Sequence, residues 1–305
     1  MLKYLITGGC GFIGSHVADR LLAEGHQVRI LDNFANSSKQ FLPASAELIV
    51  GSITDDSILT QAIQGVDGVF HLAALISVTD SITHWHQNHQ VNCSATIRLI
   101  EQARGLPIIF ASSAAVYGDS PELPQNEETT PRPLSPYAVD KLTCEKHFKL
   151  AWDLHRTPSA CFRFFNVYGP RQNPTSPYSG VISKFAALLA NHDPITIYGD
   201  GTQRRDFIYV KDVAAILVKT MSMSLRGAEV YNLCTGVSVT INELAGLMAR
   251  IAGVAVQKKY APARLGEILI SCGDPSKALG VLGLQARTSL VEGLSELMQF
   301  HSKEF

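Results

Sequence analysis

The 305-residue sequence lacks the features that would assign it to several specialised classes of protein. Its formal net charge is only −1, so it offers no overall positive field for nucleic acid or for an anionic membrane. No apolar run approaches the ~20 residues that a membrane-spanning helix needs. Residues 2–7 already have the pattern of a strand, so we expect no signal peptide. We therefore expect a cytoplasmic protein that binds neither nucleic acid nor membrane.

Cysteine is present but not in the patterns that indicate a metal centre or a disulfide framework. The six cysteines are scattered along the chain, at positions 10, 93, 144, 161, 234 and 272. None forms a CxxC pair or a zinc-type spacing with histidine, and most lie in apolar segments. This distribution predicts reduced core thiols and no metal site.

A glycine-rich turn opens the sequence. Residues 3–15 read KYLITGGCGFIGS, with a short apolar strand before the turn and an apolar helical pattern from Phe12 onward. Gly8 allows a tight turn, Gly11 lets the backbone approach a ligand, and Gly14 lets the helix pack close to the strand. Because the free N–H groups at the start of a helix attract negative charge, this arrangement predicts a seat for a pyrophosphate.

The second predicted strand, residues 27–31, ends in an acid that supports the same interpretation. Asp32 is placed to accept hydrogen bonds from the ribose hydroxyls of an adenosine. Asn33 follows it, and no arginine stands nearby to receive a 2′-phosphate, which favours NAD over NADP. An ordinary structural turn is the alternative to dinucleotide binding.

Strand and helix patterns alternate regularly over the first half of the chain, which predicts a parallel, doubly wound sheet. The further strands are expected over residues 48–53, 68–74, 107–111 and 159–166, and the helices over 55–63, 88–104 and 136–155. His71, inside one of these buried runs, is expected to be a core histidine.

After Tyr168 the pattern changes to loops, short strands and helices. Strands are expected over residues 195–198, 207–210 and 230–233, and helices over 181–190, 212–221, 241–251 and 289–300. The predicted fold is therefore an α/β Rossmann domain over residues 1–168, and a smaller α+β substrate-binding lobe over 169–305 that is partly interwoven with it.

Tyr137 and Lys141 are four residues apart in a predicted helix, so their side chains share one face. A lysine ammonium, together with an oxidised nicotinamide ring, would favour the phenolate and lower the tyrosine pKa from ~10. Ser112 and Ser113 end the preceding strand, where a hydroxyl could hold the same substrate oxygen. Beside a dinucleotide seat, these groups predict a hydride-transfer site. Two unrelated surface residues at this common spacing are the alternative.

The whole chain resembles the extended short-chain dehydrogenase/reductases, and within them the nucleotide-sugar 4-epimerases that act on UDP-glucose and UDP-N-acetylglucosamine. The matching motifs are TGGCGFIGSH, VFHLAA, SSAAVYG, SPYAVDK, RFFNVYGPRQ, SPYSGVISKF, GDGTQRRDFIYVKDVA, YNLCTG and RLGEILIS. The resemblance implies that Ser113, Tyr137 and Lys141 are catalytic and that NAD is the cofactor.

The resemblance also implies where NAD is held. The residues implied to contact it are Gly8, Gly11, Phe12, Ile13, Gly14, Asp32, Asn33, Asn36, Ser37, Ser52, Ile53, Leu72, Ala73, Ala74, Tyr137 and Lys141. Ser52 departs from the family, which usually has an aspartate there for the adenine amino group. Contact with adenine would then be weaker or come from the backbone of Ile53.

A second group of residues is implied to bind a UDP-sugar. This group is Ser112, Ser113, Asn166, Val181, Ile182, Ile195, Tyr198, Arg205, Arg264, Glu267 and Ser271. Arg205 and Arg264 would clamp the diphosphate, since a guanidinium makes paired hydrogen bonds to phosphate. Glu267 would accept from the uridine ribose. Ser271 stands where a small residue admits N-acetylated sugars in this family.

The implied reaction is the 4-epimerisation of a UDP-hexose through a transient 4-keto sugar. Related dehydratases and decarboxylases carry acids where this chain has Ala114 and Ala115, which favours the epimerase. A uronic-acid 4-epimerase, a dehydratase, a decarboxylase or a non-catalytic NAD-binding sensor are the alternatives. The resemblance also implies a homodimer formed by the helices near residues 88–104 and 136–155.

Overall fold

The computed structural model describes residues 1–173, 180–255, 257–263 and 268–304. Residues 302–304 are described by their backbone only. The chain forms two compact units that interleave along the sequence. Unit 1 comprises Met1–Gly118, Thr130–Phe164 and Ala214–Tyr231, and unit 2 comprises Asp119–Thr129, Phe165–Val213 and Asn232–Phe305. The boundary predicted at residue 168 lies close to the break after Phe164, and each unit also takes shorter segments from the other side of it.

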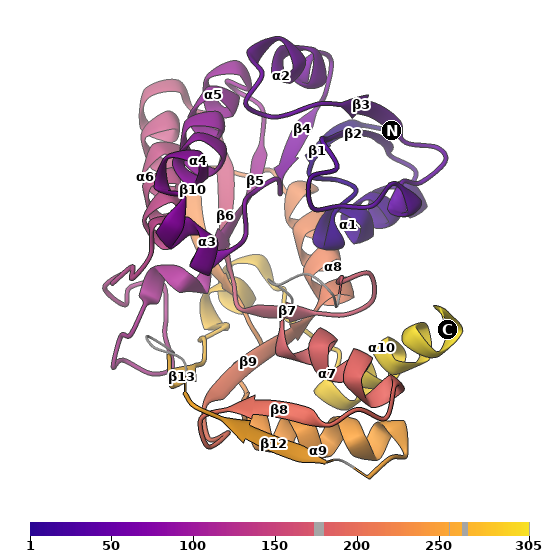
Figure 1. The fold of residues 1–305 in the computed structure, drawn as a ribbon. Coiled ribbons are helices and arrows are strands. Elements are labelled where there is room, and N and C mark those ends of the chain that lie inside the picture. The colour runs from indigo at the N-terminus through magenta and orange to yellow at the C-terminus, as the bar shows by residue number, and fades with distance from the viewer. Residues whose placement is uncertain (174–179, 256, 264–267, 305) are drawn as a thin grey trace. The chain divides into compact units, whose positions relative to one another are not determined.

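A seven-stranded sheet forms the centre of unit 1, in the order β10-β6-β5-β4-β1-β2-β3 (Figure 1). The strands are β1 (Lys3–Thr7), β2 (Gln27–Asp32), β3 (Glu47–Val50), β4 (Gly68–His71), β5 (Ile108–Ser113), β6 (Ser159–Phe164) and β10 (Ala228–Leu233). Among the first six strands, every pair of neighbours in the sheet is parallel. The strand order reverses between β1 and β4, where ligands bind in such sheets. The predicted doubly wound sheet is confirmed.

The helices of unit 1 are α1 (Phe12–Ala23), α2 (Asp56–Ile63), α3 (Val78–Thr83), α4 (Trp85–His89), α5 (Ala95–Gln102), α6 (Pro136–His155) and most of α8 (Val210–Met221). The helix expected over residues 88–104 is confirmed as one continuous helical run over residues 85–102, in which a π-helical turn η2 (Gln90–Ser94) joins α4 to α5. Short 3-10 turns, η1 (Lys39–Phe41) and η3 (Ala114–Tyr117), lie in the connections.

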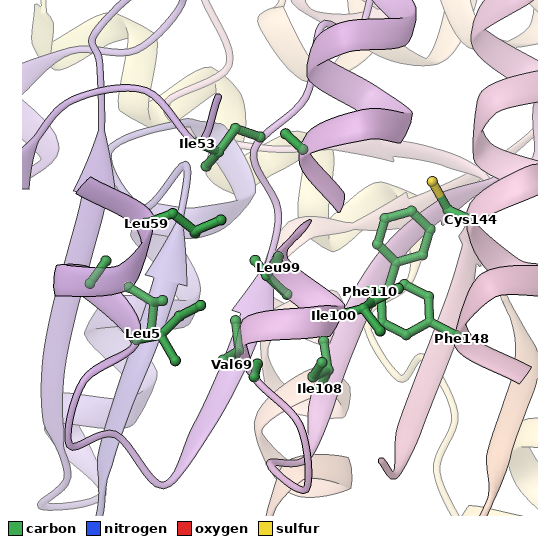
Figure 2. Close-up of a cluster of buried hydrophobic side chains, with 14 of the residues drawn as sticks. Leu5, Ile53, Leu59, Val69, Leu99, Ile100, Ile108, Phe110, Cys144 and Phe148 are labelled. Carbon is green, nitrogen blue, oxygen red and sulfur yellow. The ribbon is translucent and has the colours of Figure 1, made fainter. Parts of the chain in front are cut away.

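Helix α6 has the bounds that the sequence predicts, because both of its ends are specified locally. The Ser135 side chain accepts a hydrogen bond from the Ala138 amide, and Pro136 occupies the first turn. Arg156 ends the helix in the left-handed conformation, with φ at 55°. The helix packs on the apolar core of the unit, in which Phe110 of β5 and Phe148 of α6 lie together (Figure 2).

One charged cluster is buried in unit 1. Arg163 of β6 donates to Glu145 of α6 through Nε at 3.0 Å and Nη2 at 2.7 Å, and their side chains are 5% and 4% exposed. Ser112 Oγ of β5 donates to Glu145 Oε1 at 2.5 Å, and Arg163 Nη1 donates to the Tyr117 hydroxyl at 3.0 Å. These bonds join β5, β6 and α6, the elements that carry the predicted catalytic residues.

Unit 2 mixes short strands with helices. The strands are β7 (Asn166–Tyr168), β8 (Ile195–Tyr198), β9 (Arg204–Tyr209), β11 (Ser238–Thr240), β12 (Lys258–Ala261) and β13 (Ile270–Ser271). Its helical segments are α7 (Val181–Ala190), α9 (Ile241–Ala252), the π-helical η4 (Ala278–Leu282) and α10 (Leu290–Glu304). β9 pairs with β7, β11 and β13, while β8 pairs with β12. The bounds predicted for residues 181–190 and 195–198 are confirmed, whereas β11, β12 and β13 had no prediction.

Removing Arg163 should cost far more stability than removing an exposed arginine. Arg163→Ala leaves the Glu145 carboxylate buried without its partner, so we expect a loss of about 3–5 kcal/mol in the free energy of unfolding. Arg20 pairs with Glu24 on the surface, where the side chains are 52% and 37% exposed, so Arg20→Ala should cost under about 1 kcal/mol. Urea unfolding measures both variants, and equal losses would contradict the prediction.

Candidate active site

The turn between β1 and α1 has the close backbone packing that its glycines predict. Gly8 has a φ of +71°, and a Cβ there would lie 2.9 Å from the Ala73 Cα. A Cβ on Gly14 would lie 2.2 Å from the Gly8 carbonyl oxygen. Gly11, the N-cap of α1, provides no side-chain hydrogen bond to the first turn of the helix. The first amides of α1, from Phe12, Ile13 and Gly14, are therefore presented at the end of β1 in the way that a pyrophosphate requires.

Asp32 ends β2 beside this turn, and its carboxylate is held from both sides. Oδ2 accepts from the Cys10 amide at 2.9 Å, and Oδ1 accepts from the Phe34 amide at 2.9 Å and from Ser37 Oγ at 2.6 Å. The residue is only 6% exposed. Asn33 and Asn36 are exposed on the loop that follows. The fixed carboxylate suits the predicted contact with a ribose.

The other predicted cofactor residues lie at the ends of β3 and β4. Leu72 and Ala73 donate their amides to the Thr7 carbonyl and hydroxyl, both at 3.2 Å, and Ala74 follows them. Ser52 Oγ lies 2.8 Å from Thr54 Oγ1 and accepts from the Thr54 amide at 3.2 Å. The Ile53 side chain belongs to the apolar core, which leaves only its backbone for a cofactor (Figure 2).

His71 is a core histidine, as predicted. Its Nδ1 lies 2.7 Å from Thr7 Oγ1, and its Nε2 lies 2.9 Å from Thr96 Oγ1. Because Thr96 donates its own proton to the Asn92 carbonyl at 2.8 Å, it accepts from His71 Nε2. Burial, aided by the Lys141 charge, lowers the pKa of His71 to about 3. The imidazole is therefore neutral and fully hydrogen-bonded.

Ser113, Tyr137 and Lys141 come together at the carboxyl end of β5. Ser113 ends β5 beside Tyr137 and opposes the rise of its pKa, and the Ser113 Oγ accepts from the Ala115 amide at 3.1 Å. Lys141 Nζ donates to the Ala111 carbonyl at 2.7 Å and lies 5.7 Å from the centre of the Tyr137 ring. The four-residue spacing thus places the phenol and the ammonium on one face of α6.

The ionisation of the pair reflects its burial. Burial lowers the pKa of Lys141 to about 8, so that its ammonium is still mostly protonated at neutral pH. Burial raises the pKa of Tyr137, and the hydrogen bond with Ser113 opposes that rise. The expected lowering of the Tyr137 pKa is therefore not a property of the protein alone, since it depends on positive charge arriving near the phenol.

Ser112 lies near the end of β5, as predicted, but its side chain is directed toward Glu145. Its side chain is on the opposite face of β5 from Ser113, as successive residues of a strand must be. The Ser112 hydroxyl is 2% exposed and donates to Glu145. The predicted contact of Ser112 with a substrate has no support in this arrangement, and its role is to anchor the buried ion pair.

Three residues predicted to bind substrate lie close together on the sheet of unit 2. Ser271 of β13 is the register partner of Arg205 of β9. Asn166 of β7 donates Nδ2 to the Asp206 carbonyl at 2.9 Å. Arg205 Nη1 donates to the Arg204 carbonyl at 2.9 Å. The polar groups of Asn166, Arg205 and Ser271 therefore come from three paired strands.

The remaining predicted substrate residues divide into three groups. Ile182 and Ile195 are buried, 1% and 0% exposed, so their side chains serve the core of unit 2. Val181 is half-buried at the start of α7, and Tyr198 is 39% exposed, so both side chains remain accessible. Arg264 and Glu267 lie outside the described residues.

Sequence reasoning missed the residues that hold these groups in position. Asp206 is fully buried beside Arg205, and its carboxylate accepts from the Thr235 amide and hydroxyl at 2.9 and 2.6 Å and from the Gly236 amide at 2.9 Å. Burial raises the pKa of this carboxyl, against those hydrogen bonds. The place of Asp206 in the RRDFIYV motif was the available signal, as was the charge of Arg163 within the otherwise apolar segment ACFRFF.

Residues 4–234 match the model of the NAD dependent epimerase/dehydratase family. The chain belongs to this family. A UDP-glucose 4-epimerase from Mycolicibacterium smegmatis is 33% identical over 313 residues, which cover 98% of each chain. The structure of a Thermotoga maritima UDP-glucose 4-epimerase with UDP-glucose has a TM-score of 0.96 at 32% identity and covers 99% of both chains. A UDP-N-acetylglucosamine 4-epimerase from Methanobrevibacter ruminantium M1, solved with UDP-N-acetylmuramic acid, has a TM-score of 0.95 at 33% identity, covering 100% of this chain and 99% of its own.

Membership of the family confirms the predicted relationship and NAD as the cofactor. The residues present fit that cofactor, because a Cβ on Gly8 or Gly14 would fill the cradle at the start of α1 and Asp32 stands at the end of β2. Within the described ranges, the structure contains no helix with the length and apolar character needed to cross a membrane.

Substituting Gly14 should remove the bound cofactor, because its methyl group would collide with the Gly8 carbonyl and open the turn. Protein carrying Gly14→Ala is expected to copurify with at least ~10-fold less NAD(H) than the parent, as measured by enzymatic cycling of the heat-released nucleotide. Gly246→Ala is the matched control, since Gly246 also lies in a helix but a Cβ there meets nothing within 4 Å. Normal NAD(H) content in Gly14→Ala would contradict the proposed cradle.

Proposed function

We propose that this protein is an NAD-dependent 4-epimerase of UDP-hexoses. The observation that carries the proposal is the cluster of Ser113, Tyr137 and Lys141 at the end of β5, next to a segment that has no carboxylate. The residues after Ser113 are Ala114 and Ala115, which begin the 3-10 turn η3. A site of this composition can move a proton and a hydride at one carbon, but it has no further acid to eliminate water.

Tyr137 is the proposed base for the sugar 4-hydroxyl. Ser113 is proposed to hold the same substrate oxygen, a role supported by its place at the end of β5 beside Tyr137. Lys141 remains mostly protonated at neutral pH, and its ammonium stabilises the phenolate that forms. NAD, held by the turn of Gly8, Gly11 and Gly14 and by Asp32, would supply the acceptor and donor for the hydride at C4. Tyr137 then returns the proton, so that only the configuration at C4 has changed.

The alternatives within the family need groups that this segment does not contain. The dehydratases and decarboxylases of the resemblance use an acid near Ala114 and Ala115. A non-catalytic sensor would have no need of the buried Lys141 ammonium, which is kept 4.7 Å from the centre of the Phe110 ring and hydrogen-bonded to a backbone carbonyl. A uronic-acid 4-epimerase shares the chemistry proposed here and differs only in the sugar.

The nucleotide end of the substrate is assigned to unit 2. Asn166 and Arg205 are proposed to bind the diphosphate, together with Arg264, and Glu267 is proposed to bind the uridine ribose. Tyr198 and Val181 are proposed to frame the uracil. Ser271, adjacent to Arg205 in the sheet, is small enough to leave space for an N-acetyl group, so we propose that UDP-GlcNAc and UDP-glucose are both substrates.

Replacing the proposed base should remove turnover without removing the cofactor. Tyr137→Phe is expected to lower kcat by about 100-fold or more, the usual contribution of a positioned acid–base group. The assay follows the conversion of UDP-glucose to UDP-galactose, and of UDP-GlcNAc to UDP-GalNAc, by NMR without added NAD.

The matched control is Tyr260→Phe, because Tyr260 is 57% exposed and its hydroxyl contacts only Asn242 among the described partners. It should leave kcat and NAD(H) content unchanged. Full activity of Tyr137→Phe would exclude Tyr137 as the base. Absence of turnover with every UDP-sugar, or stoichiometric release of NADH, would overturn the 4-epimerase itself.

We also propose a homodimer formed through α6. Val139, Leu150 and Leu154 on this helix are 47%, 50% and 65% exposed. At about 100° per residue they lie within about 60° of arc, so they form one apolar line along the helix. Ile97 is partly buried against the core, which assigns that apolar residue to the monomer.

A charge placed on this line should separate the subunits. Leu154→Glu is expected to shift the mass measured by light scattering from twice the 33.1 kDa chain mass toward the monomer at micromolar concentration. Val281→Glu is the control, because Val281 is equally exposed, at 64%, but lies on the short π-helix η4. A monomeric parent protein, or a dimer unaffected by Leu154→Glu, would contradict the assignment.

A further inference from the structure

A series of buried hydrogen bonds runs from α6 to the segment that follows β4. Asp140 of α6 accepts through Oδ2 from Asn88 Nδ2 of α4 at 2.6 Å. The Asn88 Oδ1 accepts from Asn92 Nδ2 of the π-helical turn η2 at 2.9 Å. Asn92 in turn holds the backbone of Leu75, since its Oδ1 accepts from the Leu75 amide at 2.8 Å and its Nδ2 donates to the Leu75 carbonyl at 2.9 Å. Three side chains thus connect α6 to the backbone of Leu75.

The direction of every bond in this Asp140–Leu75 network is determined by its two ends. A carboxylate only accepts, so Asp140 turns the Asn88 nitrogen toward itself and leaves the Asn88 oxygen for Asn92. The Leu75 amide and carbonyl orient the Asn92 side chain in the same way. Asn88, Asn92 and Asp140 are only 2%, 2% and 5% exposed, so bulk water does not compete for these bonds. Without the Asp140 acceptor, the Asn88 amide loses its buried partner and no longer fixes Asn92.

The two ends of the network belong to the two halves of the candidate active site. Asp140 directly precedes Lys141 and follows Tyr137 by three residues, so it lies on the turn of α6 that carries the proposed base. Leu75 directly follows residues 72–74, which are predicted to contact NAD. Hydride transfer requires both the base and the cofactor at defined distances from one carbon, and an error of about 1 Å costs about 100-fold in rate.

Asp140 is held on its other side by a residue that solvent reaches. His89 Nδ1 lies 2.7 Å from Asp140 Oδ1, and the His89 side chain is 54% exposed. The hydrogen bond with Asp140 raises the pKa of His89. Both oxygens of Asp140 therefore have partners inside unit 1, so Asp140 acts on the reaction through Asn88 and not by contact with the substrate.

We propose that Asp140 and Asn88 are positioning residues that fix segment 72–75 relative to Tyr137 and Lys141. The inference rests on the proposed 4-epimerase function and adds to it the residues that align the cofactor with the base. The link consists of side chains only, so it can be cut at Asp140 or Asn88 without changing any residue that is proposed to contact NAD or the sugar.

Hydrogen exchange tests the link without any assay of activity. In the full-length protein with its NAD(H) retained, Asp140→Leu is expected to speed amide exchange in residues 72–77 by at least ~10-fold and to leave β1 unchanged. Asp140→Asn keeps an oxygen for the Asn88 amide and should exchange like the parent. Asp153→Asn, the control on the same helix, removes a surface pair with Lys149 and should change nothing. Unchanged exchange in Asp140→Leu, or equal acceleration in both Asp140 variants, would overturn the link.

Kinetics tests the positioning role. The assays are run at pH 6.5, well below the Lys141 pKa of about 8, so that loss of the Asp140 charge does not deprotonate the ammonium. Asp140→Leu should lower kcat per bound NAD(H) by at least about 10-fold with little change in KM, because unit 2 is proposed to bind the nucleotide. The deuterium isotope effect on kcat, measured with UDP-glucose labelled at C4, should increase because hydride transfer becomes slower than the other steps. Asp140→Asn should keep kcat within about 3-fold of the parent.

Asn88→Leu cuts the same network from α4 and should reproduce the slower exchange-protected state and the lower kcat even if Asp140→Leu does not fold. A merely structural role would lower the thermal unfolding temperature or the NAD(H) content but leave kcat per bound cofactor and the isotope effect at parent values. That result would overturn the proposal. A parent protein that turns over no UDP-sugar would overturn the 4-epimerase instead, and hydrogen exchange would then decide by itself whether Asp140 fixes residues 72–77.

Discussion

The buried ion pair between Arg163 and Glu145 is the interaction on which the catalytic part of unit 1 depends. Two charges removed from water are stable only when every donor and acceptor around them is satisfied, and here Ser112 and the Tyr117 hydroxyl complete the set. These bonds form only when β5, β6 and α6 pack together in one particular register. Ser113 follows Ser112 on the strand, and Lys141 precedes Glu145 by one helical turn, so fixing the pair also fixes the proposed proton-transfer site.

The same burial that orders this site sets its ionisation. Lys141 and Tyr137 are both enclosed, which disfavours the charged form of each, lowering the pKa of the lysine to about 8 and raising that of the tyrosine. The Ala111 carbonyl partly compensates the ammonium by accepting its hydrogen bond. The phenol of Tyr137 thus keeps its proton until additional positive charge is near. Tyr137 therefore becomes a base only when an oxidised cofactor is present.

The sequence predicted those parts of the molecule that local residues determine. The glycine turn, the bounds of α6 and the residues gathered around Tyr137 follow from steric limits, capping and helical spacing, all of which act over a few positions. What it could not predict depends on long-range packing. Nothing near Ser112 and Ser113 reveals which hydroxyl faces Glu145, because that choice is made by Arg163 on another strand. Likewise the π-helical turn η2 within the helix was not predicted, and His89 meets Asp140 only when α4 packs against α6.

The late position of β10 in the chain has a consequence for biosynthesis. This strand joins the sheet of unit 1 beside β6, where the Ser159 amide donates to the Gly227 carbonyl just before it, yet the segment Phe165–Val213 of unit 2 lies between β6 and β10 in the sequence. A ribosome that has released residues 1–168 has therefore exposed β6 as an open edge, with unpaired backbone groups. The cofactor domain cannot finish folding as the first half of the protein emerges. It must wait until the chain has passed through residues 165–213 of the second unit and returned, so that an isolated fragment ending at residue 168 is a poor substitute for the whole protein.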